Sequence, residues 1–196
     1  MFSKIARELI EIGGRFYTRG WVLGTSGNLS AVVSRQPLRL AITASAVHKG
    51  KLHLSQIVQI DASGEVVPKR AAGSARGAPR ASAETLLHLE IVRRRGAGAV
   101  LHTHSVWSTI LSDLHERERG LAIDGYEMLK GLAGVDSHTR REWIPIVANA
   151  QDMTQLARTV GDVLDAHKDA HAFLLAERRN APDVIAGSDH SRTGAA

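Results

Sequence analysis

The stretch GAGAVLHTHS, residues 96–105, is the part of the sequence that decides how the chain folds: a short apolar run ends in two histidines two positions apart. The run follows a glycine that ends a predicted helix, and its length is typical of a β-strand. On a strand, residues i and i+2 lie on one face, so His102 and His104 can point at one atom. That geometry suits zinc, but a catalytic zinc takes three protein ligands, so a third must come from elsewhere. The alternative is that the two histidines merely lie on one face of a strand and bind no metal.

Length and composition favour a single globular domain. The chain has 196 residues, 43% hydrophobic and 23% charged, which is ordinary for a soluble protein. Its apolar runs are too short to span a bilayer, and the first residues, MFSKIARELIEIGG, lack the apolar block of a signal peptide. We therefore expect a cytoplasmic protein that has no membrane partner.

The sequence has no cysteine, so any metal must be held by histidine nitrogen or carboxylate oxygen. The formal net charge is +5, but the arginines cluster in KRAAGSARGAPR (69–80), RRRG (93–96) and ERRN (177–180) instead of following one helix. Only 4% of residues are aromatic, which leaves little for nucleic-acid bases to stack on. We expect no nucleic-acid partner, and instead a small phosphorylated substrate drawn to a basic surface.

Hydrophobic spacing predicts helices over residues 2–16 with Ser3 as a possible N-cap, over 83–95 with Ser82 as N-cap, from Ser105 onward, and over 152–168. Strands are predicted in GTSGNLSAVV (24–33), LRLAIT (38–43), IVQID (57–61), EVV (65–67), GAVLHTH (98–104), IPIVA (144–148) and AFLLA (172–176). Helices around a largely antiparallel sheet place the chain in a mixed α/β class.

Four motifs together resemble the class II aldolase and adducin family: RGAGAVLHTHS (95–105), GYEMLKG (125–131), GTSGNLS (24–30) and ITASAVHKG (42–50). The resemblance covers residues 1–175. It implies a single class II aldolase-like α/β domain, in which helices flank a central, mainly antiparallel β-sheet. It also implies a homotetramer with one Zn²⁺ per subunit, held by three histidines near a subunit interface.

The resemblance assigns roles to individual residues. His102 and His104 match the first two zinc ligands. In the dehydratases of the family a glutamate after this pair is the acid/base, which is Glu127 here, whereas in the aldolases it lies upstream, at Glu84. Outside the resemblance, Glu127 could be a solvated residue near a helix start. Glu84 could likewise serve only the N-terminus of its helix, or act as a neighbour of the ligands or substrate.

For the dehydratases, the implied reaction is zinc-dependent conversion of 5-methylthioribulose 1-phosphate to 2,3-diketo-5-methylthiopentyl 1-phosphate in methionine salvage. Zinc acts as a Lewis acid on the ketone, and a carboxylate moves the proton to the departing hydroxyl. The resemblance supports Asn28, Thr43 and Ser45 as phosphate neighbours. Lys49 is either a further cation for the phosphate or a solvated loop charge.

The resemblance stops abruptly in residues 176–196, which we interpret as a divergent C-terminal tail. Family members have a Gly-His-Gly loop here that supplies the third zinc histidine, and this chain has no such motif. An abrupt break is what a shift of reading frame would produce. His171 is predicted to be structural, and His190 is a candidate for the missing ligand.

Two other interpretations stay open. The first is a sugar-phosphate class II aldolase, in which Glu84 would be the acid/base. The second is a metal-deficient, inactive member that serves as a binding or assembly module, which the missing third histidine favours.

Overall fold

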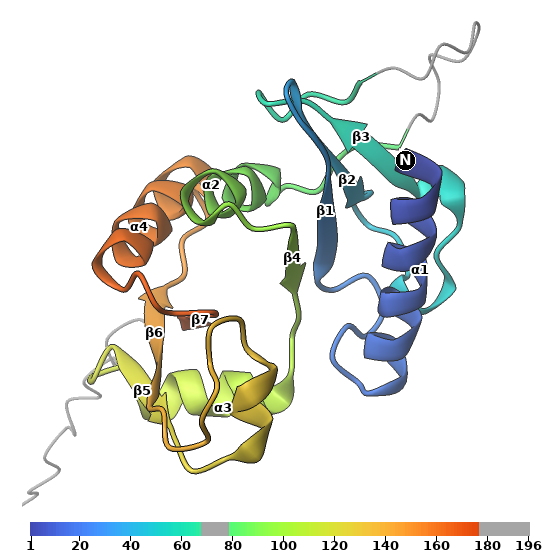
Figure 1. Ribbon diagram of the computed structural model, residues 1–196. Coiled ribbons are helices and arrows are strands. Elements are labelled where there is room, and N and C mark those ends of the chain that lie inside the picture. The colour runs from blue at the N-terminus through green and yellow to red at the C-terminus, as the bar shows by residue number, and fades with distance from the viewer. Residues whose placement is uncertain (68–78, 177–196) are drawn as a thin grey trace, which may run out of the picture.

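The computed structural model describes residues 1–67 and 79–176, in which helices surround two β-sheets (Figure 1). The first sheet has the order β3-β2-β1-β4 and is antiparallel throughout; its strands are β1 (Asn28–Arg35), β2 (Leu38–Thr43), β3 (Ile57–Ile60) and β4 (Ala99–His102). The second has the order β5-β6-β7, from β5 (Gly120–Ile123), β6 (Glu142–Ala148) and β7 (Leu174–Ala176). Only its β6–β7 pair is parallel.

The helices are α1 (Phe2–Thr18), α2 (Thr85–Arg95), α3 (Val106–Leu114) and α4 (Met153–Ala166), with short 3₁₀ turns η1 (Lys49–Lys51), η2 (Leu54–Gln56) and η3 (Glu127–Gly131). The predicted α/β class with mainly antiparallel strands is confirmed. The division of the strands between two sheets was not predicted, and neither were β5 and η3, because their short polar surroundings carry no periodic signal. The tail after Ala176 lies outside the described residues.

Helix α1 covers one face of the first sheet. Its apolar stripe buries Ala6 and Leu9 against Leu29, Ala41 and Ile57 of the sheet. The predicted N-cap, Ser3, is wrong: the helix begins at Phe2 with Met1 in the cap position. The hydrophobic stripe located this helix correctly because burial, rather than capping, holds it in place.

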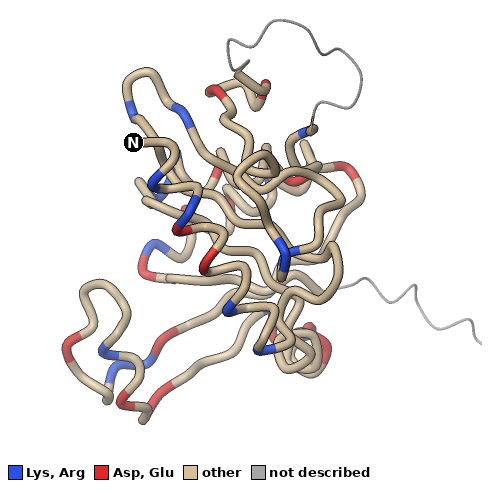
Figure 2. The backbone as a smooth tube through the Cα atoms, turned by 90° about the vertical axis from the view of Figure 1, so that its right-hand side faces the viewer, with Lys and Arg blue, Asp and Glu red and all other residues tan. Residues whose placement is uncertain are grey.

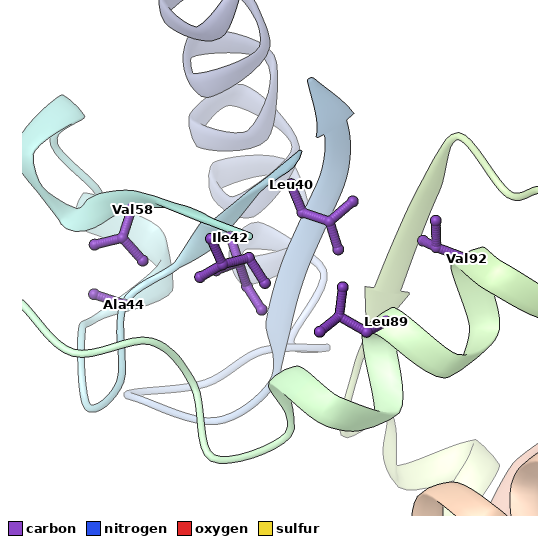
Figure 3. Packing of buried hydrophobic residues seen from close by; sticks show 7 residues of the cluster. Leu40, Ile42, Ala44, Val58, Leu89 and Val92 are labelled. Carbon is purple, nitrogen blue, oxygen red and sulfur yellow. The ribbon is translucent and has the colours of Figure 1, made fainter. Parts of the chain in front are cut away.

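Helix α2 covers the opposite face. Leu89 and Val92 pack on Leu40, Ile42 and Val58 of the sheet (Figure 3). The predicted N-cap, Ser82, lies two residues too early: Glu84 holds the cap position, and the Ser82 hydroxyl accepts a hydrogen bond from the Glu84 N–H (3.3 Å).

Helix α2 also contacts α4, which lies beside it in Figure 1. Leu87 of α2 is buried with Leu156 and Val160 of α4 and with Val147 of β6. Helix α4 begins after Asp152, whose carboxylate accepts hydrogen bonds from two backbone N–H groups of the first turn. Helix α2 therefore packs against the first sheet on one side and against α4 and β6 on the other.

The surface combines mixed charge with apolar residues on one helix. Figure 2 shows Lys and Arg interspersed with Asp and Glu along the described chain. The large exposed hydrophobic side chains include Trp107 (74% exposed) and Leu114 of α3, and Met128 of η3 (89%). Among the described residues, no helix combines the length and the apolar character needed to cross a membrane.

Candidate functional site

The two histidines lie side by side where β4 ends. His102 is the last residue of β4 and pairs with Asn28 of β1, while the backbone N–H of His104 donates to the carbonyl of Trp21 (2.7 Å). The ring centroids of His102 and His104 are 4.7 Å apart. The predicted approach of these two side chains is therefore confirmed, with His104 just beyond the strand.

Gly27 lets the loop before β1 lie against this strand end. Its φ is +66°, and a Cβ at this position would lie 2.6 Å from the carbonyl oxygen of His102. Any larger residue would therefore push the loop away from His102. The glycine in GTSGNLS serves this close approach.

Glu84 links His102 to Asn28 of β1 through hydrogen bonds. Its Oε2 accepts hydrogen bonds from Asn28 Nδ2 and from His102 Nδ1, both at 2.5 Å. Burial disfavours the charged carboxylate, but the hydrogen bond and charge of His102, helped by the amide of Asn28, prevail and lower the pKa of Glu84 to about 2. Glu84 is thus an anion at neutral pH and a weak proton acceptor.

The contact with Glu84 also fixes the orientation of His102. With Nδ1 directed at the carboxylate, Nε2 is the nitrogen through which His102 can bind a metal, an arrangement common among metal-binding histidines. Of the two alternatives left open for Glu84, the structure therefore favours contact with a proposed ligand. Its helix role is limited, since its side chain makes no capping hydrogen bond.

A pocket of about 210 Å³ opens beside this cluster. It is lined by polar and small residues from four segments: Thr25, Gly27, Asn28, Ala44, Ser45, Ala46, Lys49, Ser82, Ala83, Glu84 and His104. From the sequence, Ser82 was expected only as a helix cap. Lys49 was expected either to bind the phosphate or to be a solvated charge in a loop. The motif ITASAVHKG was the only signal for Lys49.

Lys49 is not a solvated loop charge, because only 2% of it is exposed. Its ammonium group donates to the carbonyls of Thr25 (3.0 Å) and Val47 (2.9 Å), which joins two loops of the pocket wall. Burial lowers the pKa of Lys49, and the charge of Glu84 opposes this shift. An ammonium has three N–H groups, so one remains for a bound anion.

The other predicted residues lie in different places. Ser45 lines the pocket. Thr43 is fully buried, pairs with Ile57 on the α1 side of the sheet, and its hydroxyl accepts from the backbone N–H of Leu29 (3.2 Å). Glu127 is 69% exposed, forms an ion pair with Lys130, lies 3.1 Å from Nδ1 of His138, and does not line the pocket. One chain therefore brings together His102, His104 and Glu84, but leaves Glu127 outside the pocket.

The donors present fit a metal only in part. His102 and His104 supply two imidazoles, the nitrogen ligands that zinc prefers. Across residues 1–67 and 79–176, however, no three His, Asp or Glu side chains are grouped so that they could hold a metal ion. His190 lies outside these ranges.

His171 has no nitrogen left for a metal. Its Nδ1 contacts Oε1 of the buried Glu142 (2.9 Å), and its Nε2 contacts the carbonyl of Ala133 (2.8 Å). Both partners are acceptors, so both ring nitrogens carry hydrogen. The predicted structural role of His171 agrees with these contacts.

The His171–Glu142 contact predicts a loss of stability at alkaline pH. The hydrogen bond to Glu142, with that to Ala133, raises the pKa of His171 although burial opposes it. The stabilisation is complete below the ordinary histidine pKa and disappears as the pH rises through the raised value. We expect His171→Gln to lower the urea midpoint at pH 6 and much less at pH 9. The exposed His167→Gln is the control, and an equal loss from His171→Gln at both pH values would contradict the charged pair.

A buried histidine lies one helical turn after Glu84. His88 is 1% exposed, and its Nδ1 is 2.7 Å from Oγ of Ser30. Burial, followed by the charge of His102, lowers the pKa of His88 to about 4, so the ring is neutral at physiological pH. Because no motif includes it, His88 is expected from the sequence to be a surface or core-edge residue, and its full burial shows that this expectation is wrong.

Comparisons with known proteins agree with this architecture. A family model described as the Class II Aldolase and Adducin N-terminal domain matches residues 7–178. A methylthioribulose-1-phosphate dehydratase from Methylococcus capsulatus is 42% identical over 176 residues, which cover 89% of this chain and 80% of the relative. Another from Sorangium cellulosum is 39% identical, with 89% and 79% covered.

Two solved structures show the same fold. An L-fuculose-1-phosphate aldolase from Thermus thermophilus superposes with a TM-score of 0.63 at 23% identity, covering 90% of this chain and 77% of the other. A sugar-phosphate aldolase from Thermotoga maritima gives 0.56 at 16% identity, with 84% and 78% covered. The predicted class II aldolase-like fold is confirmed.

Proposed function

Because this chain belongs to the class II aldolase and adducin family, we propose that it is a hydro-lyase that dehydrates 5-methylthioribulose 1-phosphate to 2,3-diketo-5-methylthiopentyl 1-phosphate in methionine salvage. The relatives that share about two fifths of its residues are dehydratases, which are carbon–oxygen lyases. The observation that carries the proposal is the meeting of His102, His104 and Glu84 beside a polar pocket with a buried lysine. Residues 1–175 form the proposed catalytic domain, and the proposed location is the cytoplasm.

His102 and His104 are the proposed ligands of one Zn²⁺ per subunit. Such an ion would supply Lewis-acid chemistry toward the ketone oxygen of the substrate. Within one chain, no third side chain among the described residues joins His102 and His104 as a ligand. The role of Glu84 in this proposal is to accept the Nδ1–H of His102 and so keep Nε2 directed at the metal.

Glu127 is the proposed acid/base, which removes the proton next to the ketone and delivers it to the departing hydroxyl. The contacts of Glu84 support this division of roles, because its Oε2 already accepts hydrogen bonds from His102 and Asn28. Glu127 lies between the exposed Tyr126 and Met128.

A homotetramer would bury Tyr126 and Met128 together with the apolar side chains of α3. It would also place Glu127 at a subunit interface. The exposure of Trp107, Leu114 and Met128 supports such an assembly, since large exposed apolar groups gather at protein interfaces.

The phosphate is proposed to bind near Lys49 and Ser45 at the wall of the pocket. Asn28 and Thr43 were expected beside it as well. Asn28 lines the pocket but already gives its Nδ2 to Glu84, and its Oδ1 has no hydrogen-bond partner among the described residues. Thr43 contributes indirectly, by holding the backbone of Leu29 next to Asn28.

Two substrates distinguish the proposed activity from the aldolase alternative. We expect the zinc-supplemented protein to consume 5-methylthioribulose 1-phosphate with a kcat/KM at least about 100-fold above that for L-fuculose 1-phosphate, a difference of about 2.7 kcal/mol in transition-state binding. The reverse preference would assign the chain to the aldolases. Turnover of neither substrate, together with absence of bound zinc, would favour the inactive binding module.

A further inference from the structure

Two polar contacts connect β1 with the start of α2. Asn28 and Ser30, two residues apart on β1, contact Glu84, which precedes the helix as its cap, and His88, four residues later. Residues 84 and 88 are about one helical turn apart, so the two contacts hold the start of α2 against β1 at two points.

All of these groups lie on one face of the sheet. Asn28 pairs with His102 across the strands, and Ser30 pairs with Val100, whose side chain packs into the cluster beneath α2. The contact between Ser30 and His88 is thus the next one along β1 after the contact of Glu84 with Asn28 and His102. The backbone links them too, since the N–H of His88 donates to the carbonyl of Glu84 (3.2 Å).

A histidine at the buried position 88 lowers the stability of the fold. Its Nε2 has no hydrogen-bond partner among the described residues, although it is shielded from solvent. A buried polar atom without a partner destabilises a fold, and leucine would fill the space without that cost. What histidine adds over leucine is a polar atom that fixes the helix at one point against Ser30.

We infer that Ser30 and His88 are a positioning pair, which holds the carboxylate of Glu84 against His102 by fixing the first turns of α2 on β1. The pair touches neither the pocket nor a substrate, and it acts only through Glu84. The inference extends the proposed function, but the contact that it explains exists whether or not the chain is a dehydratase.

The direct test observes His102 in metal-free protein. Long-range ¹H–¹⁵N spectra report the tautomer of each histidine, and the His102 signals are assigned by their loss in His102→Asn. We expect a His102 Nδ1–H bonded to carboxylate in the native chain, and its loss or marked weakening in His88→Leu and in Ser30→Ala. Should His88→Leu fold poorly, Ser30→Ala removes only a hydroxyl and keeps the test valid.

Kinetics provide the second readout if the chain is active. A loss of outer support commonly costs about 10- to 100-fold in activity, so we expect His88→Leu and Ser30→Ala to lower kcat roughly tenfold while KM changes less than about twofold. The double variant should lose no more than either single variant, and His88→Asn, which keeps a polar nitrogen near Nδ1, should recover part of the loss. Leu89→Ala, which removes packing of the same helix, should lower the unfolding midpoint and leave kcat unchanged.

Two results would overturn the inference. The first is an unaltered His102 Nδ1–H signal in both folded variants. The second is a drop in kcat for Leu89→Ala as large as that for His88→Leu, because helix stability alone would then explain the effect. A chain that lacks dehydratase activity would still give a decisive spectrum.

Discussion

Glu127→Gln is expected to lower kcat by about 10²- to 10⁴-fold, the usual contribution of a positioned general acid/base. Glutamine has the shape of glutamate but cannot take up the proton beside the ketone, whereas substrate binding does not need the charge. The side chain is 69% exposed in the single chain, so the substitution should leave the unfolding midpoint unchanged. Steady-state kinetics with 5-methylthioribulose 1-phosphate measure the effect.

Lys130→Met is the matched control for Glu127→Gln. It removes the ion pair of Glu127 with Lys130 (2.6 Å) but keeps the carboxylate. Surface ion pairs contribute little to stability, and the control should retain turnover within a few-fold of the native chain. If Glu127→Gln turned over like the native chain while Glu84→Gln was inactive, the acid/base role would pass to Glu84.

His102→Asn is expected to weaken zinc binding by at least about 100-fold, because it removes one of the two imidazoles that the described chain offers. Glu84→Gln should weaken it by about 10- to 100-fold, since the amide leaves His102 without its carboxylate partner. Competition with a chelator of known affinity gives both values.

His167→Asn is the control for a general effect of losing a histidine, because this residue is exposed beyond the C-terminus of α4. Its zinc affinity should equal that of the native chain. Equal affinities for native, His102→Asn and Glu84→Gln proteins would show that any bound zinc lies elsewhere.

The sequence predicts those parts of the fold that depend on burial. Apolar periodicity located α1 and α4 because each must cover a hydrophobic surface. The strand before the histidines was predicted from its short apolar run, although Leu101 remains exposed, and with it the approach of His102 to His104. Helix starts were predicted less well: at α2 the predicted cap, Ser82, lies two residues before Glu84.

The remaining parts of the site depend on contacts between distant segments. Glu84 meets Asn28 across 56 residues, and Ser30 meets His88 across 58, and no local pattern encodes either pairing. Lys49 was identified as a candidate from its motif, but its burial follows from the loops that surround it. Glu127 was left open between an acid/base and a solvated residue near a helix start, and in the single chain it lies at the start of the exposed turn η3, outside the pocket.

The central claim, dehydration at this site, is tested most directly by identifying the product formed from ¹³C-labelled 5-methylthioribulose 1-phosphate. We expect a single phosphorylated diketone that keeps all five carbons of the sugar chain and has lost one water, formed by the native chain and not by His102→Asn. Two shorter carbonyl compounds would show aldol cleavage instead. Unchanged substrate with zinc-loaded, folded protein would contradict the proposed activity altogether.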